Sequence, residues 1–107
     1  MALVVTALPS IVIVSGSSNG NAVASIDDAF AITIFSPSAL TNTITVDVEP
    51  STTGSSFVTL QSGGSDVAIP AGKATLLSPS GFRQLRLVAS GSEAASRTFS
   101  LTKSFLV

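Results

Sequence analysis

Residues 43–49 read TITVDVE and are followed by Pro50. Ile44, Val46 and Val48 alternate with polar residues, so the segment predicts a β-strand with one dry face and one wet face. Such alternation is typical of an antiparallel sheet that packs one face on a core and leaves the other in water. This strand is the clearest guide to the fold.

The same signature recurs on both sides of this segment, as short apolar runs separated by Gly, Pro, Ser and Asn. No window keeps apolar residues at the three-and-four spacing of a helix. We predict an all-β fold in a single domain, residues 1–107: an antiparallel β-sandwich of jelly-roll type with about nine short strands and no substantial helix. The other candidate strands are residues 3–8, 11–14, 23–26, 29–35, 57–61, 67–69, 73–77, 82–88 and 97–107.

Alternation also assigns faces within these strands. Phe30, Ile32 and Ile34 are expected to share one face, and Leu85 and Leu87 to point inward around an outward-facing arginine. In the last strand, residues 99, 101 and 105 are expected on one face and the hydroxyl residues between them on the other. We therefore expect most of the six Phe side chains to point inward.

The N-terminal residues 2–14, ALVVTALPSIVIV, are strongly apolar. A signal peptide requires basic residues near its start, but the first basic residue of the chain is Lys73. A membrane-spanning helix requires about 20 apolar residues, and Pro9 and the polar run 15–21 interrupt this stretch. We interpret it as two buried strands, and expect no membrane partner.

Charge is scarce in this chain. Only 10% of residues are charged, against roughly 25% in ordinary soluble domains, and the net charge is −1. Ser and Thr make up 30 of the 107 residues. No electrostatic footprint for nucleic acid exists, and little repulsion keeps copies apart. The composition suits a subunit covered by neighbours, as in a homo-oligomer, or a monomer with a polar hydroxyl coat.

The chain has few side chains suited to acid–base or nucleophilic catalysis, because it has no His and no Cys. Lys73 and Lys103 are the only lysines, and we interpret both as surface residues. Asp47 and Glu49 share a strand face, as paired carboxylates of a glycosidase would, but we expect that face to be solvated. The sequence thus predicts a protein that is not an enzyme, with no catalytic residues and no cofactor.

Two sets of charged residues each allow two interpretations. Asp27 and Asp28 could contribute oxygens to a calcium site or form a simple turn before a strand. Arg83, Arg86 and Arg97 could form a basic cluster or pair with the carboxylates in salt bridges. The Gly-rich stretches have no Lys in the position of a phosphate loop, which excludes a nucleotide site.

Both ends of the chain are apolar, although chain ends usually fray and are polar. They could be ordinary strands of the sandwich, or one of them could pair with a neighbouring subunit by strand addition. The residues expected at an interface are those of the apolar termini and the loop Ser15–Asn21: Leu3, Val5, Phe105, Leu106 and Val107, with residues 15–21.

A resemblance to known proteins covers about two thirds of the chain. Residues 35–64, FSPSALTNTITVDVEPSTTGSSFVTLQSGG, resemble a turn–strand–loop–strand unit of small phage structural proteins. Residues 66–103, with IPAG and FRQLRL in that order, continue the unit and are similar to galactose-binding-like (discoidin-type) jelly rolls.

The resemblance implies a virion protein of a tailed bacteriophage. The type implied is a capsid decoration (cement) protein, made in the host cytoplasm, that sits on the capsid surface as a small oligomer and braces the major capsid protein. The alternative function is a glycan- or receptor-binding module of a tail fibre or baseplate, which a concave polar pocket or a calcium site near Asp27 and Asp28 would mark. Sugar sites commonly stack exposed Trp or Tyr on the ring, and this chain has neither.

Overall fold

A computed structural model describes residues 2–24, 26, 28–50, 56–78 and 82–107. These residues form ten strands and no helix. The strands are β1 (Leu3–Ile13), β2 (Val23–Ala24), β3 (Ala31–Phe35), β4 (Ile44–Pro50), β5 (Val58–Thr59), β6 (Gln61–Ser62), β7 (Ser65–Asp66), β8 (Ala74–Leu77), β9 (Phe82–Ala89) and β10 (Arg97–Leu106).

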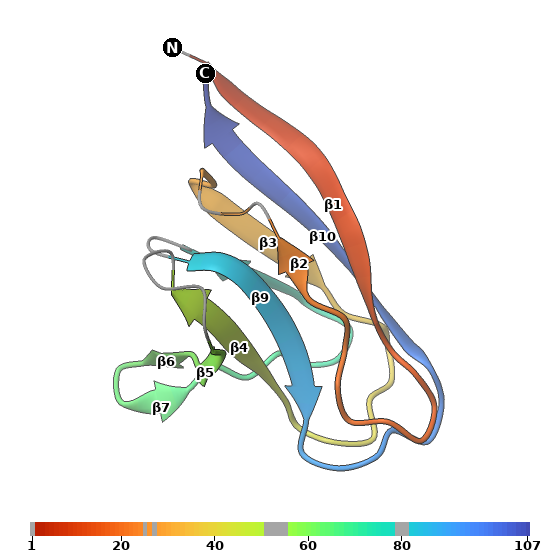
Figure 1. The fold of residues 1–107 in the computed structure, drawn as a ribbon. Coiled ribbons are helices and arrows are strands. Elements are labelled where there is room, and N and C mark those ends of the chain that lie inside the picture. The colour runs from red at the N-terminus through yellow and green to blue at the C-terminus, as the bar shows by residue number, and fades with distance from the viewer. Residues whose placement is uncertain (1, 25, 27, 51–55, 79–81) are drawn as a thin grey trace.

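Two four-stranded antiparallel sheets face each other (Figure 1). One has the order β1–β10–β3–β8 and the other the order β2–β9–β4–β5, while β6 and β7 form a separate hairpin. Apart from the consecutive strands β4 and β5, neighbours in each sheet are far apart in sequence, and the first strand pairs with the last. This interleaved order is that of a jelly roll, so the predicted all-β sandwich is confirmed.

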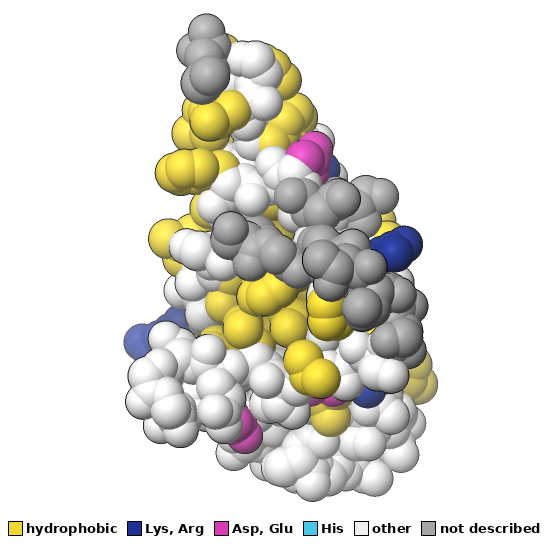
Figure 2. Space-filling view, turned by 60° about the vertical axis from the view of Figure 1, so that its left-hand side comes forward, with side chains coloured by type: hydrophobic (Ala, Val, Ile, Leu, Met, Phe, Trp, Pro, Cys, Tyr) yellow, Lys and Arg dark blue, Asp and Glu magenta, His cyan; other side chains and the backbone are white. Residues whose placement is uncertain are grey.

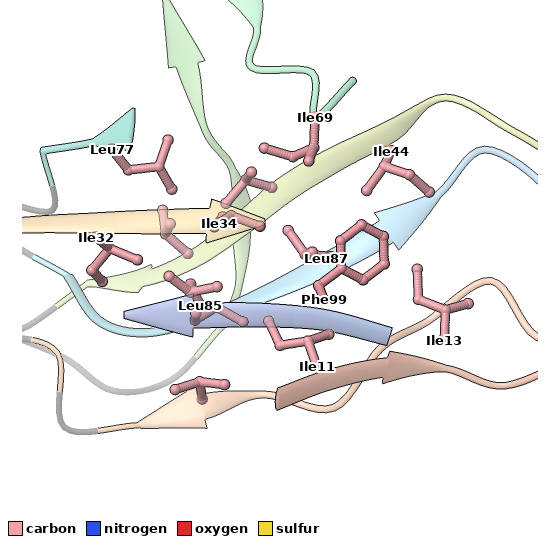
Figure 3. Packing of buried hydrophobic residues seen from close by; sticks show 14 of the residues in the cluster. Ile11, Ile13, Ile32, Ile34, Ile44, Ile69, Leu77, Leu85, Leu87 and Phe99 are labelled. Atoms are coloured by element: carbon pink, nitrogen blue, oxygen red, sulfur yellow. The ribbon is translucent and has the colours of Figure 1, made fainter. Parts of the chain in front are cut away.

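The core lies between the two sheets and is almost entirely aliphatic (Figure 3). Phe99 is its largest fully buried side chain and lies directly across from Ile11 in the ladder. The strand alternation predicted from the sequence places the core residues correctly: Ile44, Val46 and Val48 on β4, Leu85 and Leu87 on β9, and Ile32 and Ile34 on β3 are all at most 5% exposed.

The prediction for the phenylalanines is wrong. Phe99 alone among the six is fully buried; Phe30 and Phe35 are 65% and 45% exposed, and the other three are half-buried. Phe30 does not share the buried face of Ile32 because it precedes β3, at a bend.

The prediction of two buried strands in residues 2–14 is also wrong. One strand, β1, runs through Pro9 and changes register between Leu8 and Ile11, at a bulge. Ile11 and Ile13 are fully buried, but Leu3 and Val5 are 56% and 65% exposed because this half of β1 extends past the sandwich (Figure 1). An edge strand tolerates Pro9 at a bulge, since no ladder hydrogen bond needs its nitrogen.

The predicted strand at residues 67–69 is not a strand either, although Ile69 is buried and its amide donates to Ile44 O at 2.9 Å. A tight turn lies just before this segment. Gly63 and Gly64, at φ angles of 64° and 84°, connect β6 to β7. A two-residue hairpin loop of this kind requires positive φ at both positions, which glycine adopts without strain.

Gly20 lets the β1–β2 loop pass close to the core. A Cβ at this position would lie 2.5 Å from Cγ2 of Ile11 and 3.3 Å from the carbonyl oxygen of Leu87. The Gly20 amide donates to that oxygen at 2.9 Å. The loop can therefore close over the end of the core only if residue 20 has no side chain.

We expect Gly20→Ala to lower the free energy of unfolding by about 1–3 kcal/mol, because Ile11 is fully buried and cannot move aside freely. Chemical denaturation at constant pH measures this. Ala22→Ser, two residues on at an exposed position, is the control and should change stability by less than about 0.5 kcal/mol. Equal stability of the two variants would contradict the packing role of Gly20.

Candidate interaction surface

The outer face of the β1–β10–β3–β8 sheet carries no charged side chain among the described residues. Residues paired across an antiparallel ladder point to the same side, so the register shows which side chains share this face. We call it the neutral face; it consists of Leu3, Val5, Ala7, Val12, Ala31, Thr33, Phe35, Ala74, Leu76, Thr98, Ser100, Thr102, Ser104 and Leu106.

The opposite outer face, on the β2–β9–β4–β5 sheet, carries ion pairs. Arg86 Nη2 lies 3.1 Å from Asp47 Oδ2, and Arg83 Nε lies 3.1 Å from Glu49 Oε1. The guanidinium of Arg86 also lies 4.5 Å from the centre of the Phe57 ring. The two sheets therefore present chemically different surfaces.

These contacts decide between the two interpretations of the arginines: Arg83, Arg86 and Arg97 each form a salt bridge, and no basic cluster results. The expectation that Asp47 and Glu49 lie on a solvated face is wrong. Their side chains are only 14% and 9% exposed, because the arginines of β9 cover them.

The predicted interface residues at the two termini lie together. Leu3 pairs directly with Leu106, and these two residues share the neutral face with Val5. Phe105 pairs with Val4 and points to the opposite side. Val107 follows β10 and exchanges two backbone hydrogen bonds with Ala2.

These two chain ends form an arm that extends past the sandwich: residues 2–8 paired with residues 101–107. The narrow upper end in Figure 2 shows hydrophobic and uncharged side chains. Leu3, Val5, Leu106 and Val107 are 51–66% exposed there. The apolar termini predicted for an interface are thus ordered in the fold and exposed to solvent.

The predicted contact loop, residues 15–21, lies at the other end of the molecule, which is 44 Å long (Figure 1). Its backbone is held from within: Gly16 N donates to Glu93 O at 2.8 Å, Glu93 N donates to Ser17 O at 3.0 Å, and Ala89 N donates to Ser18 O at 2.7 Å. The structure therefore separates this loop from the terminal residues.

Glu93, which lies between the predicted strands 82–88 and 97–107, connects the loops at this end. Its carboxylate is fully buried and accepts four hydrogen bonds. Oε1 accepts from Thr41 N and Arg97 Nε, both at 2.9 Å. Oε2 accepts from the backbone amide of Asn42 at 2.9 Å and from its side-chain amide at 2.7 Å. Glu93 thus ties together the β1–β2, β3–β4 and β9–β10 connections.

The surroundings of Glu93 shift its pKa strongly. Burial by itself raises the pKa of this carboxyl group, but hydrogen bonds from the Thr41 backbone, the Asn42 side chain and Arg97 lower it by more, from 4.5 to about 2. The charged form is therefore the one that the fold stabilises. All four hydrogen bonds come from Thr41, Asn42 and Arg97, so the carboxylate holds these residues together at the loop end.

Asp28 and Lys103 form a fourth ion pair, at the base of the arm. Lys103 Nζ lies 2.8 Å from Asp28 Oδ1 and 5.1 Å from the centre of the Phe105 ring. The hydrogen bond from Lys103 lowers the pKa of Asp28. The expectation that Lys103 is a surface residue is wrong, because its side chain is only 12% exposed; Lys73 is exposed as expected.

The calcium interpretation finds no support in the described part of the chain. Asp28 is engaged by Lys103, and Asp27 lies outside the described residues. Where the structure describes the chain, no three Asp, Glu, His or Cys side chains come together as metal ligands. The same residues include no helix that is long and apolar enough to cross a membrane.

Two solved structures have a similar fold. One is a protein derived from the SPBc2 prophage, YomS, with a TM-score of 0.66 and 11% identity over 97% of this chain and 96% of that chain. The other, described as Bacillus endospore appendages that form a family of disulfide-linked pili, has a TM-score of 0.55 and 10% identity over 98% of this chain and 88% of that chain. No protein-family model and no curated protein matches the sequence. At these identities the likeness shows the fold.

The buried carboxylate of Glu93 makes the free energy of unfolding depend on pH in the acid range. Because the pKa of Glu93 is lower in the folded state, its contribution is fully present above pH 4.5 and is lost as the pH falls toward about 2. We expect Glu93→Gln to lower the free energy of unfolding by about 3 kcal/mol at pH 7, since buried donors lose their charged partner. Below pH 4.5, the free energy of unfolding of this variant should decrease less with falling pH than that of the parent chain.

Denaturant titrations at several pH values between 7 and about 2 would measure both effects. Asp66→Asn, on the exposed β6–β7 hairpin, is the control and should leave the acid dependence unchanged. If Glu93→Gln and Asp66→Asn gave the same acid dependence as the parent chain, the buried carboxylate would not be the source of it.

Proposed function

We propose that this chain is a non-enzymatic structural protein of a phage particle, which decorates and stabilises the capsid through protein–protein contacts. The observation that carries the proposal is the neutral face. No ionised side chain of this face has to lose its hydration when a partner covers it, so a partner can bury it at low electrostatic cost. The hydroxyl groups of its Ser and Thr residues can bond to water or to a partner.

The exposed apolar side chains of this face are suited to such contacts. Leu76 is 68% exposed and Phe35 is 45% exposed, on neighbouring strands of the same sheet. The centres of protein interfaces are depleted in charge and enriched in aromatic residues. Salt bridges occupy the other outer face instead, which would then remain in water.

The comparisons support this proposal in a general way. One structural neighbour is derived from a prophage, and the other is described as belonging to a family of disulfide-linked pili. The resemblance of residues 35–103 to small phage structural proteins points the same way. A location on the capsid surface is part of the proposal.

A second candidate function, a glycan- or receptor-binding module of a tail fibre or baseplate, is favoured by one cavity. Its volume is about 360 Å³, and polar and apolar side chains line it: Leu60, Gln61, Ser62, Val67, Leu76, Leu77, Ser78 and Phe82. The amide of Gln61 and the hydroxyls could bond a sugar, and Phe82 is the only aromatic ring among the described residues of the lining.

Co-sedimentation with matched empty capsids tests the first proposal. We expect the parent protein to bind at a fixed stoichiometry and Phe35→Lys to weaken binding at least tenfold, which is about 1.4 kcal/mol, because a charge must then be desolvated on the neutral face. Ala24→Lys, on the exposed outer side of β2, is the matched control and should bind as the parent does.

Unchanged melting temperatures of the two variants would show that the fold is intact. Equal binding by Phe35→Lys and Ala24→Lys would contradict the role of the neutral face. The second function would be established instead if the parent protein did not bind capsids but bound a sugar on a glycan array, and if Gln61→Ala abolished that sugar binding.

A further inference from the structure

Strand β1 lies at the edge of its sheet, so one side of its backbone has no partner within that sheet. Ala2 and Val107 exchange both hydrogen bonds, at 3.0 and 2.9 Å. In an antiparallel ladder, residue pairs that exchange both backbone hydrogen bonds alternate with pairs that exchange none. The N–H and C=O groups of Leu3, Val5 and Ala7 therefore point away from β10.

The other half of the same edge is capped. The side-chain amide of Asn21 acts as a strand partner: its Nδ2 donates to Ser10 O at 3.0 Å, and its Oδ1 accepts from Val12 N at 2.8 Å. Ile13 forms a β-bridge with Gly20. The edge is thus closed from Ser10 to Ile13 by the chain's own loop.

No described residue caps Leu3, Val5 or Ala7 in this way, and their side chains are exposed. Figure 1 shows this half of β1 along the outer margin of the arm. Natural edge strands are commonly protected by a charged residue, especially Lys. Strand β1 has no charged residue, and its proline and bulge lie at the boundary with the capped half.

We propose that the open half of β1 pairs with the same segment of a second copy of this chain, antiparallel and about a two-fold axis at Val5. Val5 then lies opposite Val5 of the partner subunit, and Leu3 lies opposite Ala7 of the partner subunit. Three bonded pairs give about six backbone hydrogen bonds. The two sheets become one sheet of eight strands, and the two neutral faces become continuous.

A second copy suits this edge because the segment is complementary to itself. A two-fold axis at Val5 places Val5 opposite its own equivalent and the residues beside it opposite residues of the same short segment, so a charged edge would repel its copy. Residues 2–8 carry no charge, and their side chains opposite one another would be small or aliphatic. The inference does not depend on the capsid role: a dimer that does not bind capsids would still support the pairing of β1 with a second copy.

The mass of the full-length protein in solution, by sedimentation equilibrium, tests the pairing. We expect a dimer for the parent chain. Val5→Lys should raise the dissociation constant at least tenfold, because it places two like charges opposite each other, whereas Val5→Thr should dimerise as the parent does. Mixing Val5→Lys with Val5→Glu should restore the dimer as a heterodimer.

Cysteine cross-linking tests the register, and the chain has no cysteine of its own. Val5→Cys should form a disulfide dimer under mild oxidation, because paired Cα atoms lie about 5.5 Å apart. Leu3→Cys should not cross-link to itself across about 14 Å, but should cross-link to Ala7→Cys. A monomeric parent, or a dimer in which Leu3→Cys cross-links to itself but not to Ala7→Cys, would overturn the proposal.

Discussion

The pairing of the first strand with the last is the interaction on which the rest of the structure depends. Strand β10 lies between β1 and β3, so a single C-terminal strand joins the start of the chain to its middle. Its inward residues Phe99 and Leu101 fill the core, and its outward residues form the middle row of the neutral face. Without β10 the sheet would separate into β1 and the β3–β8 pair, and the jelly roll could not close.

The two ends of the molecule are stabilised by different physics. At the loop end, the buried carboxylate of Glu93 accepts four hydrogen bonds, and its backbone binds Gly16 and Ser17, so this one residue ties three connections together. A buried charge that is fully hydrogen-bonded allows one arrangement of these donors, since any other leaves it unpaired. At the terminal end, the arm is held by backbone pairing and by the ion pair of Lys103 with Asp28 at its base. The loop end is therefore closed, and the arm offers backbone and apolar groups to solvent.

The few charged side chains of the described residues are distributed unequally between the outer faces of the two sheets. Ion pairs hold the carboxylates of β4 against the arginines of β9, and no ionisable side chain lies on the neutral face in the described strands. Both proposals follow from this asymmetry, because a surface without charge and an edge without charge can each be covered by protein at low cost.

The sequence by itself determined the strand class and most of the core. Alternation at residues 44–48 and 85–87 depends only on the pleat of a strand, so local pattern was enough to identify their buried sides. It also predicted the apolar termini as candidates for contact, although it wrongly placed Leu3 and Val5 in a buried strand. What only the tertiary structure decided are relations between distant segments: the register that pairs Leu3 with Leu106, the side chain of Asn21 against β1, and the donors around Glu93. Each depends on which strands are neighbours, and a period of two residues carries no information about neighbours.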